Sequence, residues 1–317
     1  MPTIVSSATD LRGCSMKIIF SRKGFDAENG GVASPILPDG RLCSIPIPSR
    51  SGKYMFRDIR FDNQDLGRIV EDLTRNKKKK YVGSDRTHFD PDLRRDALPW
   101  KRGWLPAFGP SGPAQTLLAE KGVGVGDLFL FFGWFRKVEE ENGHYQYVRN
   151  VRTAPNIHLL FGWLQIGTVY HVFPADSGLP TWAGRHAEVS DGQDWRDADW
   201  YSHNWALHVA NKHLDLPGVQ KELPGGGAFE KYDQRLCLTE PGKTRGHWRL
   251  PGWMYPFPDK NPLGFHRDKR KWRKDGKWAL LQVADIGQEF VLDCNEYPQQ
   301  KVRQSSAITQ NRPMMIT

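Results

Sequence analysis

Two apolar runs stand out in an otherwise polar chain and predict its central strands. Residues 126–136 read GDLFLFFGWFR and residues 158–167 read HLLFGWLQIG, both rich in Phe, Trp, Leu and Ile. Runs of about ten residues with this aromatic content favour strands over helices. Alternation along the first run would place Leu128, Leu130, Phe132 and Trp134 on one side and Phe129, Phe131, Gly133 and Phe135 on the other. A strand that is apolar on both sides is predicted to be central and covered on both faces.

Weaker patterns predict the elements around these two strands. Residues 137–156 are polar and are expected to form a long excursion between the strands. Residues 65–75 carry their apolar positions at helical spacing. Pro-Asp-Gly at 38–40 predicts a turn within a hairpin. Glycines and prolines from residue 108 predict a loop leading into a short helix that ends near residue 121. Further strands are expected at 16–21, 204–209, 279–283 and 289–293.

Together these elements predict an α+β fold. Its sheet is expected to be mixed or mainly antiparallel, with few helices and long irregular loops. Residues 16–299 would form a single domain, because the first patterned strand starts at Met16. Residues 1–15 are interpreted as a disordered extension or a mis-called start, and residues 300–317 as a polar tail.

The net charge of +9 is concentrated in two short runs. Residues 75–80 hold five basic residues and no acid, and residues 267–277 hold seven basic residues and two acids. Local positive charge is typical of a surface that binds anions such as nucleic acid, although either run could simply be a solvated face. Four scattered cysteines, no membrane-length apolar run and no signal-peptide pattern favour a cytoplasmic protein.

His88, Asp90 and Asp92 form an H-x-D-x-D pattern, which would project to one side of an extended segment. An imidazole and two carboxylates suit general acid-base catalysis or a divalent metal, so the cofactor stays open between none and a metal ion. Asp-Pro-Asp is also common in turns and helix caps, and that alternative remains.

Arg22, Lys23 and Asp26 follow the first predicted strand, in a loop before Gly30 and Gly31. The two cations could hold a phosphate, and Asp26 could orient them or act as a base. The alternative is a surface turn with a local ion pair. Gln115 lies near the start of the short helix after the glycine-proline loop, where an anion could also bind.

The C-terminal third mixes basic and aromatic residues in a way that suits nucleic acid. Base stacking needs ring faces and phosphate contacts need cations. The selected residues are Arg245, His266, Lys269, Arg270 and Trp272, within a set of rings at Trp248, Trp253, Tyr255, Trp272 and Trp278. Tryptophan is equally good core material, so both readings stand.

Histidines gather between residues 158 and 213 without the spacing of a zinc motif. A structural role is the expectation for each of them: His158, His171, His186, His203, His208 and His213. His208 and His213 are the better candidates for another role.

Seven segments in order carry a family resemblance: FSRKGFD (20–26), SPILPDGR (34–41), HFDPDL (88–93), GDLFLFFGWFR, HLLFGWLQIG, LTEPG (238–242) and GQEFVLD (287–293). The chain resembles the nucleotide modification associated domain 3 family of bacteria and phages, from Met16 to about residue 293. That resemblance implies work beside enzymes that hypermodify DNA bases, and so a context rather than a reaction. Pro110 stands where the resemblance would place a glutamine. The GDLFLF strand is also similar to strands of PUA-type barrels, which implies a distorted barrel by analogy of fold alone.

The leading hypothesis is a cytoplasmic protein that acts on nucleic-acid bases or nucleotides within a DNA-modification system. Its partners would be DNA or a nucleotide, together with other DNA-modification proteins, and no membrane. Asp26, His88, Asp90 and Asp92 are the catalytic candidates, so whether the protein is an enzyme stays open. The alternatives are a non-catalytic reader of modified or flipped bases, or an interaction module.

Overall fold

The computed structural model describes residues 16–171, 178–187, 189, 206–216, 222–256, 268–282 and 290–293. Its strands are β1 (Lys17–Arg22), β2 (Ser34–Ile36), β3 (Tyr54–Met55), β4 (Arg60–Phe61), β5 (Gln64–Asp65), β6 (Arg86–Thr87), β7 (Ala107–Phe108), β8 (Leu128–Glu141), β9 (His144–Tyr147), β10 (Ile157–His171), β11 (Ala206–Ala210), β12 (Gly226–Ala228), β13 (His247–Pro251), β14 (Trp272–Lys274), β15 (Trp278–Gln282) and β16 (Phe290–Asp293). Its helices are α1 (Leu66–Thr74) and α2 (Gly112–Glu120), with 3-10 turns η1 (Phe56–Asp58), η2 (Ala183–Arg185), η3 (Gln234–Leu236), η4 (Gly252–Met254) and η5 (Lys269–Lys271).

Nine of these strands form one mixed sheet, in the order β16-β1-β8-β10-β11-β7, with β2 and β9 also paired to β8 and β12 to β10. β1 and β2 run parallel to β8, whereas its partners β9 and β10 are antiparallel, which confirms the predicted mixed sheet with few helices. The barrel expectation is wrong. Among the described strands, β16 pairs only with β1 and β7 only with β11, so the path does not close. A single strand motif does not determine closure, because closure depends on how the outer strands pair.

β8 is the central strand, as predicted. It pairs with β10 along residues 128–135 and with β1 and β2 on its other edge. Phe129 and Phe131 face one side, where their rings lie 5.0 and 5.3 Å from that of Phe108. Phe132 faces the other side, with its ring 4.8 Å from that of Trp248. The predicted alternation is therefore confirmed, and both faces of the strand are buried in the main core.

The polar stretch after the first apolar run is more regular than predicted. β8 continues to Glu141 and turns back into β9 through Asn142 and Gly143, which both have positive φ. This hairpin was not predicted, although Asn-Gly is the strongest short hairpin signal in a sequence. Val138 and Tyr145 are the buried residues of this hairpin, and they join the second core, which forms around α1.

Helix α1 begins where the sequence predicts. The Asp65 side chain caps it by accepting a hydrogen bond from the Arg68 amide at 3.1 Å. Its predicted apolar face is buried: Leu66, Ile69, Val70 and Leu73. The turn at 38–40 is also confirmed, because Gly40 has φ of +86° and donates its amide to the Leu37 carbonyl at 2.8 Å. The helix after residue 108 is α2.

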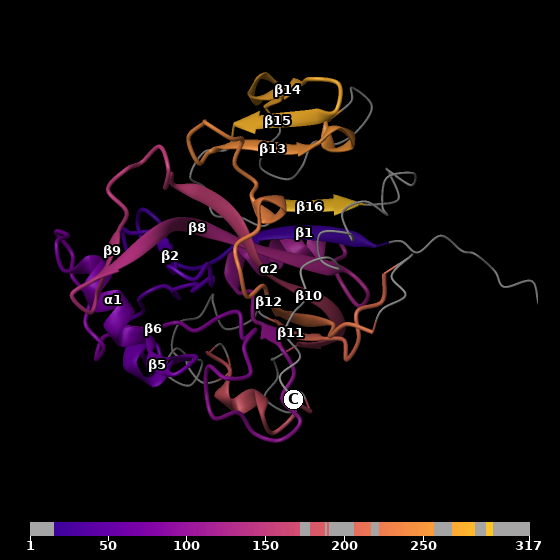
Figure 1. Cartoon of the computed structure of the whole chain (residues 1–317). Helices are drawn as coiled ribbons and strands as arrows, with labels where there is room; N and C mark the ends of the chain where they lie inside the picture. Colours follow the sequence, from indigo (N-terminus) through magenta and orange to yellow (C-terminus); the bar gives the residue numbers. More distant parts are fainter. Residues whose placement is uncertain are drawn as a thin grey trace, which may run out of the picture.

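A separate three-stranded sheet, in the order β13-β15-β14, lies above the large sheet in Figure 1, and α1 lies on the other side of β8. This small sheet contributes Trp248, Leu250, Trp272, Ala279 and Leu281 to the main core.

β11, β15 and β16 correspond to three of the predicted strands. Residues 1–15 and 300–317 lie outside the described residues. No helix in the described ranges combines the length and apolar content that a membrane crossing needs.

Candidate functional site

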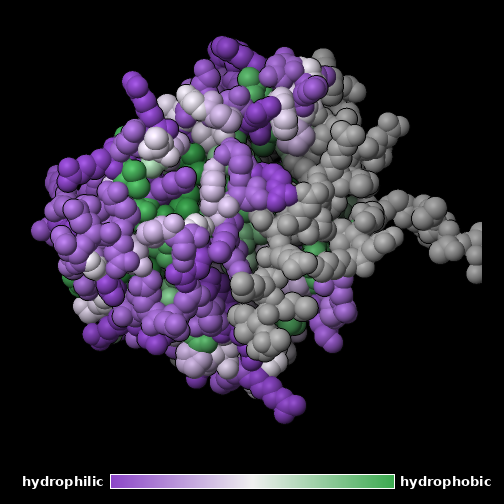
Figure 2. All heavy atoms as spheres, viewed as in Figure 1, coloured by the Kyte–Doolittle hydropathy of each residue, from purple (hydrophilic) through white to green (hydrophobic). Residues whose placement is uncertain are grey.

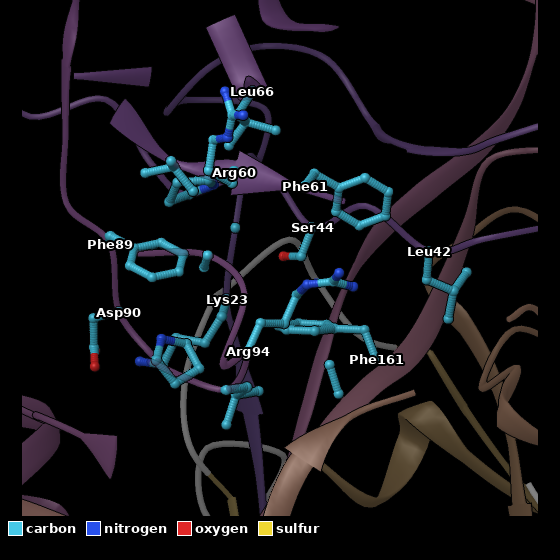
Figure 3. Close-up of a pocket in the computed structure, with 17 residues that line it drawn as sticks. Lys23, Leu42, Ser44, Arg60, Phe61, Leu66, Phe89, Asp90, Arg94 and Phe161 are labelled. Carbon is cyan, nitrogen blue, oxygen red and sulfur yellow. The ribbon is translucent and has the colours of Figure 1, made fainter. Parts of the chain in front are cut away.

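A pocket of about 610 Å3, part of it open to solvent, lies between the main core and the second core. Its lining includes three rings (Phe61, Phe89 and Phe161), three cations (Lys23, Arg60 and Arg94) and the acid Asp90. Figure 3 shows Phe89 and Phe61 on two sides of the space, with Lys23 and Arg94 between them. This mixture of rings, cations and an acid is typical of sites that hold a small organic ligand.

Strand alternation brings Lys23 to this pocket. Its amide donates to the Phe132 carbonyl at 2.8 Å, which extends the pairing of β1 with β8 by one residue. Its ammonium lies 4.3 Å from the centre of the Phe108 ring. Gly133 allows this close approach, because a Cβ there would lie 2.9 Å from the Lys23 carbonyl oxygen.

Asp90 and Asp92 are held beside β7. Asp92 and Ala107 exchange both backbone hydrogen bonds, at 2.8 and 3.0 Å. The Gly109 amide donates to Asp90 Oδ1 at 3.0 Å. The peptide bond between Asp90 and Pro91 is cis. The two side chains are only 4% and 1% exposed, and Asp90 is the one that reaches the pocket lining.

His186 joins the two carboxylates from a distant part of the chain. It follows η2, and its Nε2 lies 3.2 Å from Asp90 Oδ1 and 3.8 Å from Asp92 Oδ2. Its side chain is fully buried. Since a buried charge needs a nearby partner, the three groups form one electrostatic unit.

The two carboxyl groups have opposite pKa shifts. Burial raises the pKa of Asp92 to about 8, and the charge of Asp90 adds to the rise. Neither oxygen of Asp92 has a hydrogen-bond partner among the described residues, which fits a protonated acid. Burial also acts to raise the pKa of Asp90, but the hydrogen bond with His186 and the charges of His186, Lys23 and His88 hold it below its usual value. The environment therefore favours the ionised form of Asp90 and the protonated form of Asp92, an arrangement that can separate acid and base roles.

His208 lies on the same side of β8. Its ring is 5.4 Å from that of Phe129 and 6.3 Å from that of Phe108. Burial lowers its pKa to about 4, and His171 contributes to the fall. It is therefore neutral at pH 7. The sequence favoured His208 but gave no reason to select His186, because only the tertiary fold brings residue 186 to residue 90.

Stacked rings support one wall of the pocket. Phe89 stacks on Trp100 with ring centres 6.4 Å apart, and Trp100 stacks on Trp104 at 5.1 Å. On the opposite wall, the Arg94 guanidinium lies 4.4 Å from the centre of the Phe61 ring. None of these residues was a predicted site residue. The signal for Phe89, Trp100 and Trp104 was the aromatic content of residues 89–104, and Phe61 and Arg94 had none.

Arg22 and Asp26 do not line the pocket. Arg22 precedes Lys23 in an extended chain and so projects to the opposite side, where its guanidinium pairs with Asp26 at 3.0 Å. The Asp26 Oδ1 accepts hydrogen bonds from the amides of Glu28 and Asn29 at 2.8 and 2.6 Å. The structure thus brings Lys23 to Asp90 but leaves the other two residues in a turn.

His88 and Gln115 also lie outside the lining. The charge of His88 acts on both Asp90 and Asp92, so its side chain is close to them. Gln115 lies in the first half of α2 and is 5% exposed. Its Oε1 has no hydrogen-bond partner among the described residues.

The C-terminal candidates lie away from the pocket, on and around the small sheet. Arg245 places its guanidinium 4.1 Å from the centre of the Trp134 ring. Arg270 is exposed and pairs with Asp268 at 2.9 Å. Trp272 is 4% exposed and packs in the main core, so its ring is not available for stacking on a base. Lys269 belongs to η5, and His266 lies outside the described residues.

No group of three or more His, Cys, Asp or Glu side chains in the described part of the chain is arranged to hold a metal ion. His186 instead lies within ion-pair distance of both carboxyl groups, with Nε2 3.2 Å from Asp90 Oδ1 and 3.8 Å from Asp92 Oδ2.

Comparison with known proteins agrees with the sequence resemblance. The model of one family, nucleotide modification associated domain 3, matches residues 17–293. Comparison with curated proteins and with solved structures finds no match. The family match spans β1 to β16 and includes every residue that lines the pocket. The chain therefore belongs to the nucleotide modification associated domain 3 family.

Proposed function

We propose that the pocket binds a single nucleobase, of a free nucleotide or of a base extruded from DNA, within a nucleotide-modification system. The observation that carries this proposal is the combination of aromatic rings, cations and an ionised carboxylate in one concavity. A flat base can stack on Phe89, whose far side is supported by Trp100. Lys23, Arg60 and Arg94 supply positive charge for a phosphate.

Asp90 gives the pocket a group that can recognise or activate a base. An ionised carboxylate accepts hydrogen bonds from a ring N–H or an exocyclic amino group. The same carboxylate can take a proton from the base, with the protonated Asp92 and His186 behind it. Recognition alone makes the protein a reader, and proton transfer makes it an enzyme.

Nucleotide binding is the first test. Titration calorimetry with each of the four deoxynucleoside 5′-monophosphates should detect binding to the full-length chain. Phe89→Ala should weaken binding about tenfold, because stacking of one base contributes about 1–3 kcal/mol. Tyr170→Ala is the control: this half-buried ring lies on β10 outside the pocket lining. Absence of binding, or equal losses in both variants, would contradict the proposal.

Asp90→Asn separates the reader from the enzyme. Asparagine keeps an acceptor oxygen for the Gly109 amide but cannot act as a base at neutral pH. Nucleoside analysis of DNA incubated with either form measures turnover, and calorimetry measures binding. An enzyme should lose product formation and keep nucleotide binding. A reader should yield no product in either form.

A further inference from the structure

The small sheet of β13, β15 and β14 has a second face that the core does not use. Its inward residues include Trp248, Trp272 and Leu281, all less than 5% exposed. Since side chains alternate along a strand, their neighbours project outward. The outward positions are His247, Arg249, Pro251, Arg273, Trp278, Leu280 and Gln282.

The register aligns two arginines across this outer face. Arg249 on β13 and Arg273 on β14 both pair with Leu280 on the middle strand. The Arg249 guanidinium lies 3.9 Å from the centre of the Trp278 ring, and its Nε is 3.4 Å from Glu240 Oε2. The stacked pair therefore presents a planar, positioned cation next to the second arginine.

Positive charge dominates the chain around these strands. Segments 240–256 and 268–282 contain nine lysines and arginines against three acids. The acids are engaged locally, since Asp268 pairs with Arg270, Asp275 accepts the Trp278 amide at 3.0 Å and Glu240 pairs with Arg249. Exposed cations follow one another at Arg270, Lys271, Arg273, Lys274 and Lys277. Hydrophilic side chains dominate the surface over this sheet in Figure 2.

We propose that this outer face binds a single-stranded nucleic acid. Its phosphates would contact Arg273 and Lys277, and one base would stack on the Arg249–Trp278 pair. Arginine planes and aromatic rings stack on unpaired bases, and a neighbouring row of cations follows the backbone. An acidic protein would use the cations but would gain nothing from the stacked pair. A duplex could contact the cations, but it offers no unpaired base.

This surface is distinct from the nucleotide pocket. The pocket lies on the side of β8 that Phe131 faces, and the small sheet packs on the side that Phe132 faces. The two sites can therefore be measured separately, with a mononucleotide for the pocket and an oligonucleotide for the outer face. Failure of one proposal leaves the other standing.

Fluorescence anisotropy with a labelled 12-nucleotide DNA strand tests the outer face. The double variant Arg273→Glu/Lys277→Glu should weaken strand binding more than tenfold and reduce the slope of log affinity against log salt, because fewer phosphate contacts release fewer counterions. Lys101→Glu/Arg102→Glu makes the same charge change at two exposed residues of the loop before β7. It should change affinity less than threefold. Mononucleotide binding by the Arg273→Glu/Lys277→Glu variant should be unchanged.

Trp278→Leu provides an independent variant. It should weaken strand binding several-fold at every salt concentration, because stacking is not a counterion effect. The same probe annealed to its complement should bind more weakly than the single strand. Equal affinity of the wild type and the Arg273→Glu/Lys277→Glu variant for the strand would overturn the proposal. So would tighter binding of the duplex, or binding of an acidic polypeptide with loss of affinity in the charge variant but none in Trp278→Leu.

Discussion

The two sides of β8 face regions that handle charge in opposite ways. On the side of Phe129 and Phe131, ionisable groups are buried together, with His186 within 4 Å of both Asp90 and Asp92. On the side of Phe132, tryptophans fill the interior and the cations remain in solvent beyond them. A buried charge is costly unless it is paired or serves a ligand, whereas an exposed cation is nearly free of cost.

This difference suggests two modes of recognition. The buried side can discriminate between bases, because each polar group left unpaired by a wrong ligand carries a desolvation penalty. The exposed side, if it binds a strand as proposed, would contribute affinity that depends on salt and little on sequence. A protein of a nucleotide-modification system can use both, one for the base and one for the strand.

The largest expected effect distinguishes the two faces of the small sheet itself. Trp248 is 1% exposed and donates its Nε1 hydrogen to His158 Nδ1 at 2.9 Å. Trp248→Ala should lower the free energy of unfolding by about 3–5 kcal/mol, as large-to-small core changes do. Trp278→Ala, on the outer face of the same sheet, should lower it by about 1 kcal/mol or less. Urea denaturation measures both, and similar losses would mean that the outer face is also buried.

The next effect concerns pH and the buried carboxyl groups. Asp92 has a pKa of about 8 when folded against a usual value of 3.8, so between these values the folded chain holds a proton that the unfolded chain has lost. Its contribution to the free energy of unfolding therefore falls as pH rises through this window. His208 acts in the opposite direction between pH 4 and 6.5, because its folded pKa is about 4 against a usual 6.5. Above pH 6.5 the Asp92 contribution is no longer offset by His208.

Wild-type stability should accordingly fall by about 1–2 kcal/mol between pH 6.5 and 8, since each unit of pH is worth about 1.4 kcal/mol for one proton. Asp92→Asn carries no titrating proton there and should remove most of this slope. Denaturation midpoints at several pH values give the comparison. A wild-type curve as flat as that of the variant would show that Asp92 is already ionised at pH 6.5.

Local patterns predicted much of the fold. Alternation in 126–136 identified the central strand and its two faces, and the capped helix at 65–75 appeared at its predicted place. These features depend on neighbours in sequence. The open sheet could not be predicted, because it depends on which distant strands become the edges. β8 extends beyond the predicted strand, and this extension was not predicted although the Asn142-Gly143 turn that follows it can be recognised in the sequence.

The candidate site was predicted less completely, for a related reason. Arg22, Lys23 and Asp26 were grouped because they are adjacent, but adjacent residues of a strand point to opposite sides. Asp90 and Asp92 were identified from their spacing, and both lie in the buried cluster with His186. The rings at Phe61 and Phe161 come from distant segments, and no local pattern distinguishes them from ordinary core residues.

Lys23 and Arg22 therefore form a matched pair for the third prediction. Lys23→Met should weaken mononucleotide binding about tenfold, because a charge-assisted contact contributes about 1.5–3 kcal/mol. Arg22→Met removes the same charge one residue earlier, from a side chain that lies outside the pocket lining. Its mononucleotide affinity should stay within about twofold of the wild type. Equal losses of affinity for the two variants in calorimetry would mean that Arg22 and Lys23 do not project to opposite sides.

The smallest effect concerns Asp26. Its carboxylate accepts two backbone amides in the turn at 26–31 and pairs with Arg22. Asp26→Ala should lower the free energy of unfolding by about 1 kcal/mol, comparable to the loss of a helix cap. Since Asp26 does not line the pocket, nucleotide affinity should not change. Asp26→Asn keeps the acceptor oxygen for the turn amides and should recover part of the lost stability. A tenfold loss of nucleotide affinity at unchanged stability would instead return Asp26 to the functional site, next to Lys23, as the sequence first suggested.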